Sequence, residues 1–203
     1  MLEQDTDQLL TLAENGDSEA TRLLFTRYND RLRRMIKAFL DPRMAARLDA
    51  SDVLQDALTC AAKRLPKFLQ ERPIGFYPWL RQLVRQELAT VYRRHVEAQR
   101  RSIRKEVQIV LELTDSSVMQ LADRLLSDDT SPSQQMSRKE SREHVRLAIG
   151  QLTKIDRELL FMRCIEQLTV KQTAEALELS ESAVKSRLTR ALQKVTRMVG
   201  KNE

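Results

Sequence analysis

Apolar residues recur every three to four positions along most of the chain, which is the spacing of one face of an α-helix. Between residues 17 and 40 this stripe consists of Leu24, Tyr28, Leu32, Met35, Ile36 and Phe39. The segment then meets Asp41-Pro42, and proline cannot continue a helix. The pattern predicts a long helix from about Asp17 to Leu40.

A second helix is predicted to begin near Ser51-Asp52, a plausible N-cap, and to end at Pro66. Its apolar face comprises Leu54, Leu58, Ala61 and Leu65, and a separate polar face comprises Asp52, Gln55, Asp56, Thr59 and Lys63. Pro73 and Pro78 bracket a loop. A third, longer helix is predicted to begin near Tyr77-Pro78-Trp79, because proline suits the first turn.

The last fifty residues predict a helix-turn-helix. Thr169-Val-Lys-Gln172 fits a capping box, and Ser180, after the turn Glu178-Leu179-Ser180, can cap a helix from Glu181 to about Val199. The short first helix would bury Val170, Thr173, Ala174 and Leu177, and the long second helix would bury Val184, Leu188, Ala191, Val195 and Met198.

The opposite side of the long helix is basic and rich in hydroxyl groups. It comprises Ser182, Lys185, Ser186, Thr189, Arg190 and Gln193, flanked by Arg187. Such a face offers donors for base edges and phosphates in a major groove. The same pattern also fits an ordinary helical hairpin with a solvated basic face.

Three sections differ in charge and periodicity. Residues 1–105 and 138–203 are helical in pattern, whereas residues 106–137 hold six acids against one base, Arg124, and a turn-prone Ser/Asp/Pro stretch. We interpret residues 106–137 as a flexible acidic linker with one or two short helices. The expected fold is all-α, with two small helical domains of which the second is a helix-turn-helix domain.

Composition narrows the possible functions. The chain has 203 residues and a formal net charge of +6, which favours a polyanionic partner such as nucleic acid. Cys60 and Cys164 stand apart without a Cys/His cluster, so no metal or cofactor is expected. The N-terminus is acidic, unlike a signal sequence, and no apolar run is long enough to span a membrane. A Walker-type loop or catalytic triad signature is absent, which predicts a protein that is not an enzyme.

Basic residues are frequent after the start of the third predicted helix. Eight bases face two acids between residues 81 and 105: Arg81, Arg85, Arg93, Arg94, Arg100, Arg101, Arg104 and Lys105, against Glu87 and Glu97. These bases could neutralise phosphates. We expect Trp79 in the core, and a flipped base could instead meet the loop of residues 66–76, with Phe68 and Phe76. A plain surface connection is the equal alternative for that loop.

From Leu152 to Leu192 the sequence resembles region 4 of the sigma-70 family of RNA polymerase sigma factors. Residues 177–191 are close to the family signature "lgis.gTVKSRL.RA", with Val184-Lys-Ser-Arg-Leu188 as its specific part. Ser182-Ala183 stands where the family usually has Gly-Thr. Similar helices occur in two-component response regulators, so this half alone leaves the family open.

The first half resembles region 2 of the same family. Leu48-Asp49-Ala-Ser-Asp52-Val-Leu-Gln55-Asp56 is similar to "D.eDl.Qe.f", residues 76–86 to "F..WL..IArN", and Tyr92-Arg93-Arg94 to "yRR". Gln86 replaces the usual Asn and Thr90 the usual Asp. The short form with regions 2 and 4 is that of extracytoplasmic-function sigma factors.

The resemblance implies a cytoplasmic promoter-recognition factor that joins core RNA polymerase at the β′ coiled coil and the β flap, with an anti-sigma factor as a candidate partner. It implies polymerase binding by Asp52, Gln55 and Asp56. It implies contacts to the −10 element by Arg85, Gln86, Arg93 and Arg94. In the −35 element, Ser182, Lys185, Ser186, Thr189 and Arg190 would contact bases or edges, and Arg187 a phosphate. The alternatives are a helix-turn-helix regulator acting without polymerase and a sigma-like adaptor that binds only protein.

Overall fold

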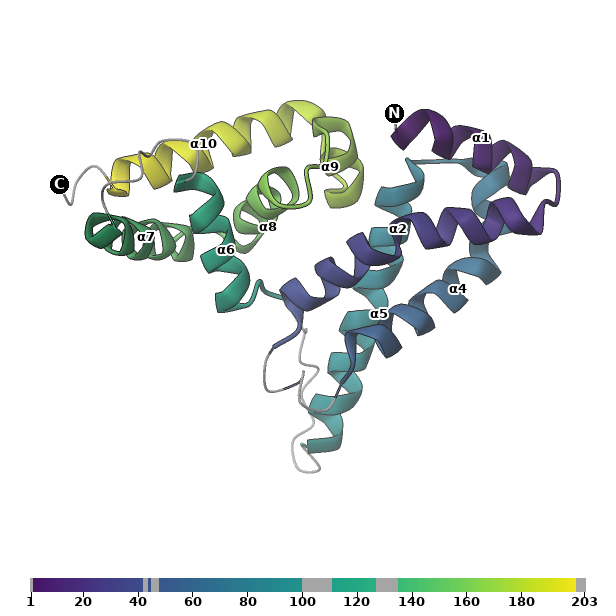
Figure 1. The fold of residues 1–203 in the computed structure, drawn as a ribbon, viewed down its shortest axis with the longest axis horizontal. Helices are drawn as coiled ribbons and strands as arrows, with labels where there is room; N and C mark the ends of the chain where they lie inside the picture. Colours follow the sequence, from purple (N-terminus) through teal and green to yellow (C-terminus); the bar gives the residue numbers. More distant parts are fainter. Residues whose placement is uncertain (1, 42–43, 45–47, 100–110, 127–134, 200–203) are drawn as a thin grey trace. The chain divides into compact units, whose positions relative to one another are not determined.

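The computed structural model describes residues 2–41, 44, 48–99, 111–126 and 135–199. Within those residues every regular element is an α-helix, as the sequence predicts, and no strand occurs. The chain divides into two compact units, residues 1–111 and 112–203, and Figure 1 shows the helices of each.

Unit 1 contains four helices in its described residues: α1 (Leu2–Glu14), α2 (Ser18–Phe39), α4 (Ala50–Glu71) and α5 (Phe76–Gln99). Helix α2 contacts all of the other three. The predicted stripe of α2 is buried, with Leu24, Leu32, Met35 and Ile36 fully inaccessible. The first and third predicted helices are therefore confirmed, and α1 is a helix that the hydrophobic pattern did not identify.

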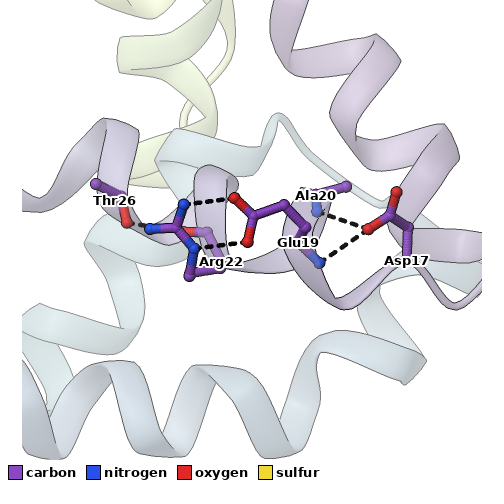
Figure 2. Close-up of polar contacts among 5 residues, drawn as sticks. All are labelled: Asp17, Glu19, Ala20, Arg22 and Thr26. Carbon is purple, nitrogen blue, oxygen red and sulfur yellow. Dashed lines mark hydrogen bonds and ion pairs between the residues drawn. The ribbon is translucent and has the colours of Figure 1, made fainter.

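Local capping explains where α2 begins. The carboxylate of Asp17 accepts hydrogen bonds from the backbone N–H groups of Glu19 and Ala20 at 2.8 and 3.0 Å, as Figure 2 shows. Glu19 then forms a two-bonded ion pair with Arg22 one turn later, which holds the pKa of the Glu19 carboxyl below its usual range. An acid in the first turn also interacts favourably with the helix dipole.

Helix α4 differs from its prediction at both ends. Asp49, not Ser51 or Asp52, is the N-cap, and its carboxylate accepts from the Ser51 N–H at 2.8 Å. The helix passes through Pro66 and ends at Glu71. The prediction of an end at Pro66 was wrong because Phe68 and Leu69, one turn later, are buried in the core. Their burial favours the continued helix over the cost of the missing proline N–H.

Unit 2 contains five helices in its described residues: α6 (Asp115–Leu126), α7 (Gln135–Gly150), α8 (Lys154–Cys164), α9 (Val170–Leu177) and α10 (Glu181–Val199). Its larger apolar cluster joins side chains from α6, α7, α8 and α10, among them Leu121, Ile149, Leu160 and Ala191. A smaller cluster joins Leu159, Ala174 and Val184 from α8, α9 and α10.

Residues 106–137 contain a short helix, as expected, but this helix, α6, packs in the core of unit 2. Residues 115–126 are an amphipathic helix whose Leu121 and Ala122 are fully buried against unit 2. Asp123 of this helix forms an ion pair with Arg142 of α7 at 2.6 Å. Two of the six acids, Asp115 and Asp123, lie on the exposed side of this helix, whose other side is apolar. The remaining parts of the predicted linker, residues 106–110 and 127–134, lie outside the described residues.

Candidate nucleic-acid interface

The helix-turn-helix forms as its local sequence predicts. Thr169 and Gln172 make both hydrogen bonds of the capping box, at 3.1 and 3.0 Å. Helix α9 ends at Glu178, which adopts the left-handed conformation that redirects the chain. The hydroxyl oxygen of Ser180 accepts from the Ala183 N–H at 3.2 Å and caps α10. Short-range interactions therefore determine how α10 leaves the turn.

Burial along α10 separates an inner from an outer face. Val184, Ala191 and Val195 are buried, as predicted, and Leu188 and Met198 pack partly against the same core. The predicted contact residues of the outer face are all exposed: Ser182, Lys185, Ser186, Thr189 and Arg190. The structure thus brings these five side chains together on one solvent-facing surface, which we call the α10 face.

Several polar groups of the α10 face bond to their own helix. Arg190 Nε donates to the Ser186 carbonyl oxygen at 3.2 Å, and the Thr189 hydroxyl donates to the Lys185 carbonyl oxygen at 3.1 Å. The other N–H groups of Arg190 and the lone pairs of the Thr189 hydroxyl oxygen are left for an outside partner. The Lys185 ammonium makes no ion pair with any described residue.

Arg187 differs from the rest of the predicted set. Its Nη1 lies 2.9 Å from Oδ1 of Asp156 in α8, and the two side chains are only 34% and 19% exposed. The guanidinium is therefore already engaged by a carboxylate within unit 2. A phosphate contact by Arg187 stays a prediction, and this ion pair competes with it.

The predicted −10 residues lie along α5 in unit 1. Gln86, Arg93 and Arg94 are exposed, and Arg85 is half-buried with its guanidinium carbon 5.6 Å from the centre of the Phe39 ring. Gln86 and Arg93 are seven positions apart and so share one side of the helix. Thr90, which replaces the usual Asp, uses its hydroxyl to donate to the Gln86 carbonyl oxygen at 3.0 Å.

The loop of residues 66–76 does not offer the aromatic platform considered for a flipped base. Phe68 and Phe76 are each 4% exposed, and Trp79 stacks on Phe68 with ring centres 4.4 Å apart. Phe68 and Phe76 belong to the unit 1 core, and the half-buried Trp79 packs against both of them, as the sequence analysis expected, rather than standing free for a base. The guanidinium of Arg72 forms an ion pair with Glu14 of α1 at 2.6 Å.

A second exposed surface lies on α4. Asp52, Gln55 and Asp56 are all exposed, and neither acid forms an ion pair with a described residue. We call these three residues the α4 face. Because Asp52 and Asp56 are exposed, the α4 face is acidic and open to an outside partner.

Asp49, the N-cap of the same helix, accepts a hydrogen bond from the Ser51 backbone N–H, and this bond lowers the pKa of Asp49.

Two family matches identify the class of protein that carries these surfaces. Sigma-70 region 2 matches residues 24–97 and sigma-70 region 4 matches residues 142–195, together more than half of the chain. The order of the two regions is the one that the sequence resemblance requires. The chain belongs to the sigma-70 family.

Relatives of this sigma-70 family member match over nearly their whole length. The RNA polymerase sigma factor CnrH of Cupriavidus metallidurans is 26% identical over 197 residues, which is 97% of this chain and 95% of the relative. The RNA polymerase sigma-H factor of Pseudomonas aeruginosa is 28% identical over 196 residues, or 96% and 94% of the two chains.

A solved structure shows the same fold. The structure of CnrH in complex with the cytosolic domain of CnrY has a TM-score of 0.57, is 20% identical, and covers 98% of this chain and 99% of that one. The region 2 match of the sigma factor includes α4 and most of α2 and α5, and the region 4 match includes α8, α9 and most of α7 and α10. Helices α1 and α6 lie outside both matches.

Sequence reasoning missed two residues that position the sigma factor's surfaces. The Tyr92 hydroxyl donates to the Phe39 carbonyl oxygen at 3.0 Å and accepts from the Asp41 N–H, so it joins α5 to the end of α2. Burial raises the pKa of Tyr92. The second missed residue is Asp156, which forms the ion pair with Arg187. No local pattern predicts this pair, because the two residues are 31 positions apart.

Other classes of site find no support in the described part of the sigma factor. No group of three or more His, Cys, Asp or Glu side chains there could hold a metal ion. Cys60 and Cys164 are both half-buried, and no disulfide joins them. Among the helices described, none is long and apolar enough to cross a membrane.

Proposed function

We propose that the two units divide the work of a promoter-directing transcription initiation factor. Unit 2 contacts the −35 element through α10, and unit 1 holds core RNA polymerase through α4 and contacts the −10 element through α5. The protein acts by binding, without catalysis, in the cytoplasm. Membership of the sigma-70 family supports the general function. The division is supported by the exposure of every predicted residue except Arg85 and Arg187, which are half-buried.

The α10 face supports the −35 contact. A helix of this width fits a major groove, and its exposed Lys185 and Arg190 can donate to guanine edges or phosphates. Ser182, Ser186 and Thr189 add hydroxyl groups that both donate and accept. Each well-formed base contact of this kind contributes on the order of 1–3 kcal/mol of discrimination.

The α4 face supports the polymerase contact. Asp52 and Asp56 are one helical turn apart, so the two carboxylates present their charge to the same side. An acidic helical surface without internal ion pairs suits a basic partner surface, such as the coiled coil of the β′ subunit that the family resemblance names. The β flap is proposed as a second contact, on unit 2.

The exposed residues of α5 support the −10 contact. Gln86 can donate and accept at a base edge, while Arg93 and Arg94 can neutralise phosphates of the unpaired strand. Stabilising an unpaired base in this way lowers the free energy of the open DNA. Strand opening then requires binding energy and no nucleotide hydrolysis.

One observation supports this function most directly: a basic recognition face and an acidic face, both exposed, lie in separate units of one chain. The test is footprinting of the purified protein on a promoter fragment, with and without core RNA polymerase. The proposal predicts specific protection only with core enzyme. Specific protection by the protein alone would instead favour a helix-turn-helix regulator.

A protein-only adaptor makes a different prediction. For an adaptor, Lys185→Ala and Arg190→Ala would leave every measured activity unchanged.

We also propose an anti-sigma partner for this chain, because its relative CnrH was solved in complex with the cytosolic domain of CnrY. Gel filtration of the chain with such a partner would test this directly.

A further inference from the structure

Asp156 lies at the junction of two helices of unit 2, and both of its carboxylate oxygens are engaged. Oδ2 accepts from the hydroxyl of Thr153, the N-cap of α8, at 2.6 Å. Oδ1 accepts from Nη1 of Arg187 in α10 at 2.9 Å. The carboxylate therefore connects the start of α8 to the middle of the helix whose outer face we assign to DNA.

The burial of this ion pair distinguishes it from the others of unit 2. Its carboxylate is the more buried one: Asp156 is 19% exposed, whereas Glu112, Glu143 and Asp123, the acids of the other ion pairs in unit 2, are 46%, 50% and 51% exposed. Less water around Asp156 means weaker screening and a larger cost when one partner is removed. The Asp156–Arg187 pair also links residues 31 positions apart, so it constrains tertiary structure.

The apolar contacts of α10 leave a part of its placement to this pair. Val184 packs with Leu159 of α8, and Ala191 packs with the larger cluster. Such contacts determine which side of α10 faces inward. Arg187 lies between Val184 and Ala191 in α10, and its ion pair with Asp156 has a defined direction. The pair therefore restrains rotation of α10 about its axis and sliding along that axis.

We propose that Arg187 is a positioning residue, which orients the α10 face through Asp156, and not a ligand of DNA phosphate. This inference rests on the proposed function of α10 at the −35 element. Lys185 and Ser186 immediately precede Arg187, so a small rotation of α10 moves both from a base edge. The nearby Asp156 carboxylate would moreover repel a phosphate that approached Arg187.

The two roles predict opposite effects of removing the Asp156 charge. If Arg187 binds phosphate, then neutralising Asp156 removes a competitor and a repulsive charge, so DNA affinity rises. If Arg187 positions α10, then neutralising Asp156 loosens the helix and DNA affinity falls. The sign of the Asp156→Asn effect therefore decides between them.

The experiment measures affinity of the holoenzyme for a short duplex that contains the −35 element and ends before the −10 element. We expect Asp156→Asn and Arg187→Gln each to weaken binding by about three- to tenfold, and the double variant to be no weaker than either single variant. Arg187→Gln should leave the salt dependence of binding unchanged. Lys185→Ala should lower the slope of log K against log salt by about 0.9, the value for one phosphate.

Thr153→Ala is the matched control, because it removes the α8 cap and the second Asp156 contact but keeps the ion pair to α10. It should lower the melting temperature and change DNA affinity by less than about twofold. If Arg187→Gln lowers the helicity of the chain, Arg187→Lys keeps the charge and is measured in its place.

Tighter or unchanged binding by Asp156→Asn, or a salt slope reduced by Arg187→Gln, would overturn the positioning role. The proposed function is judged separately by Lys185→Ala and Arg190→Ala. If these two variants weaken binding while Asp156→Asn does not, only the positioning role fails. If none of the variants alters binding, the −35 contact itself is wrong, and the positioning role with it.

Discussion

The α10 face and the α4 face are both outer surfaces of amphipathic helices, yet their chemistry is opposite. The α10 face exposes Lys185 and Arg190 among hydroxyl groups, while the α4 face exposes Asp52 and Asp56. None of these four charges forms an ion pair with a described residue, although Asp156 and Arg187 nearby in unit 2 do. Charges left without partners in the folded chain are available for partners outside it.

The partners of the two faces are inferred on different grounds. A basic face rich in hydroxyl groups on the second helix of a helix-turn-helix indicates DNA on physical grounds. An acidic helix face is common on any soluble protein, so its assignment to polymerase depends on the family. The variants below disturb first the core beneath the α10 face, then each face in turn, and last the start of a helix.

Removing a core side chain of unit 2 should have the largest effect. Leu121 of α6 is fully buried, so Leu121→Ala should lower the free energy of unfolding of unit 2 by about 2–5 kcal/mol. Hydrogen exchange of α10 amides would measure this. Leu147→Ala, at a 48% exposed position of α7, is the control and should change little. Equal exchange in the two variants would show that α6 is dispensable to unit 2.

Breaking the α10 face should lower promoter affinity without affecting core binding. For Lys185→Ala/Arg190→Ala we expect holoenzyme affinity for promoter DNA to fall about 100-fold, or ~2.7 kcal/mol. Lys194→Ala is a matched control on the same helix, because Lys194 donates to the Gln151 carbonyl oxygen of its own unit. A comparable loss with Lys194→Ala would mean that general charge, not the α10 face, determines affinity.

Breaking the α4 face should do the reverse. Asp52→Lys/Asp56→Lys should weaken binding to core RNA polymerase by about tenfold or more, since like charges would then meet across the interface. Fluorescence anisotropy of labelled protein titrated with core enzyme measures this. Glu71→Lys, a charge reversal at the far end of α4, should bind as the wild type does; if it also fails, the contact is not confined to the α4 face.

Acid should affect the start of α4 and spare the start of α10, and this is the smallest expected effect. Asp49 caps α4 with a lowered pKa, whereas Ser180 caps α10 with a hydroxyl that does not titrate in acid. Because the pKa of Asp49 is lowered in the folded chain, the cap stabilises α4 at pH values above the pKa of an unfolded Asp, about 3.9. This stabilisation is lost as the pH falls through the pKa of Asp49 in the folded chain. Hydrogen exchange of the Ser51 amide should then accelerate, and Asp49→Asn should remove this pH dependence of exchange.

The parts of the fold that the sequence predicts well are those determined by neighbouring residues. The capping box at Thr169, the cap at Ser180 and the inward stripe of α10 all depend on residues within a few turns. Each of these predictions is confirmed. The exposure of most residues in the three candidate sets also follows from helical periodicity, whereas Arg85 and Arg187 are half-buried.

The features that the sequence did not predict depend on contacts between residues distant in sequence. Helix α4 continues through Pro66 because Phe68 and Leu69 pack in the core. A short helix was expected in the acidic stretch, but its packing in unit 2 through Leu121 was not. The ion pair of Arg187 with Asp156 joins two helices, so no local pattern predicts it.

The most direct test of the central claim is transcription in vitro with core RNA polymerase on a library of promoter fragments, with and without this protein. The account predicts that transcripts starting at defined sites appear only with the protein, and that a shared −35 sequence precedes those sites. Lys185→Ala/Arg190→Ala should abolish that selection. Start sites that are the same without the protein, or no complex with core enzyme, would contradict the account.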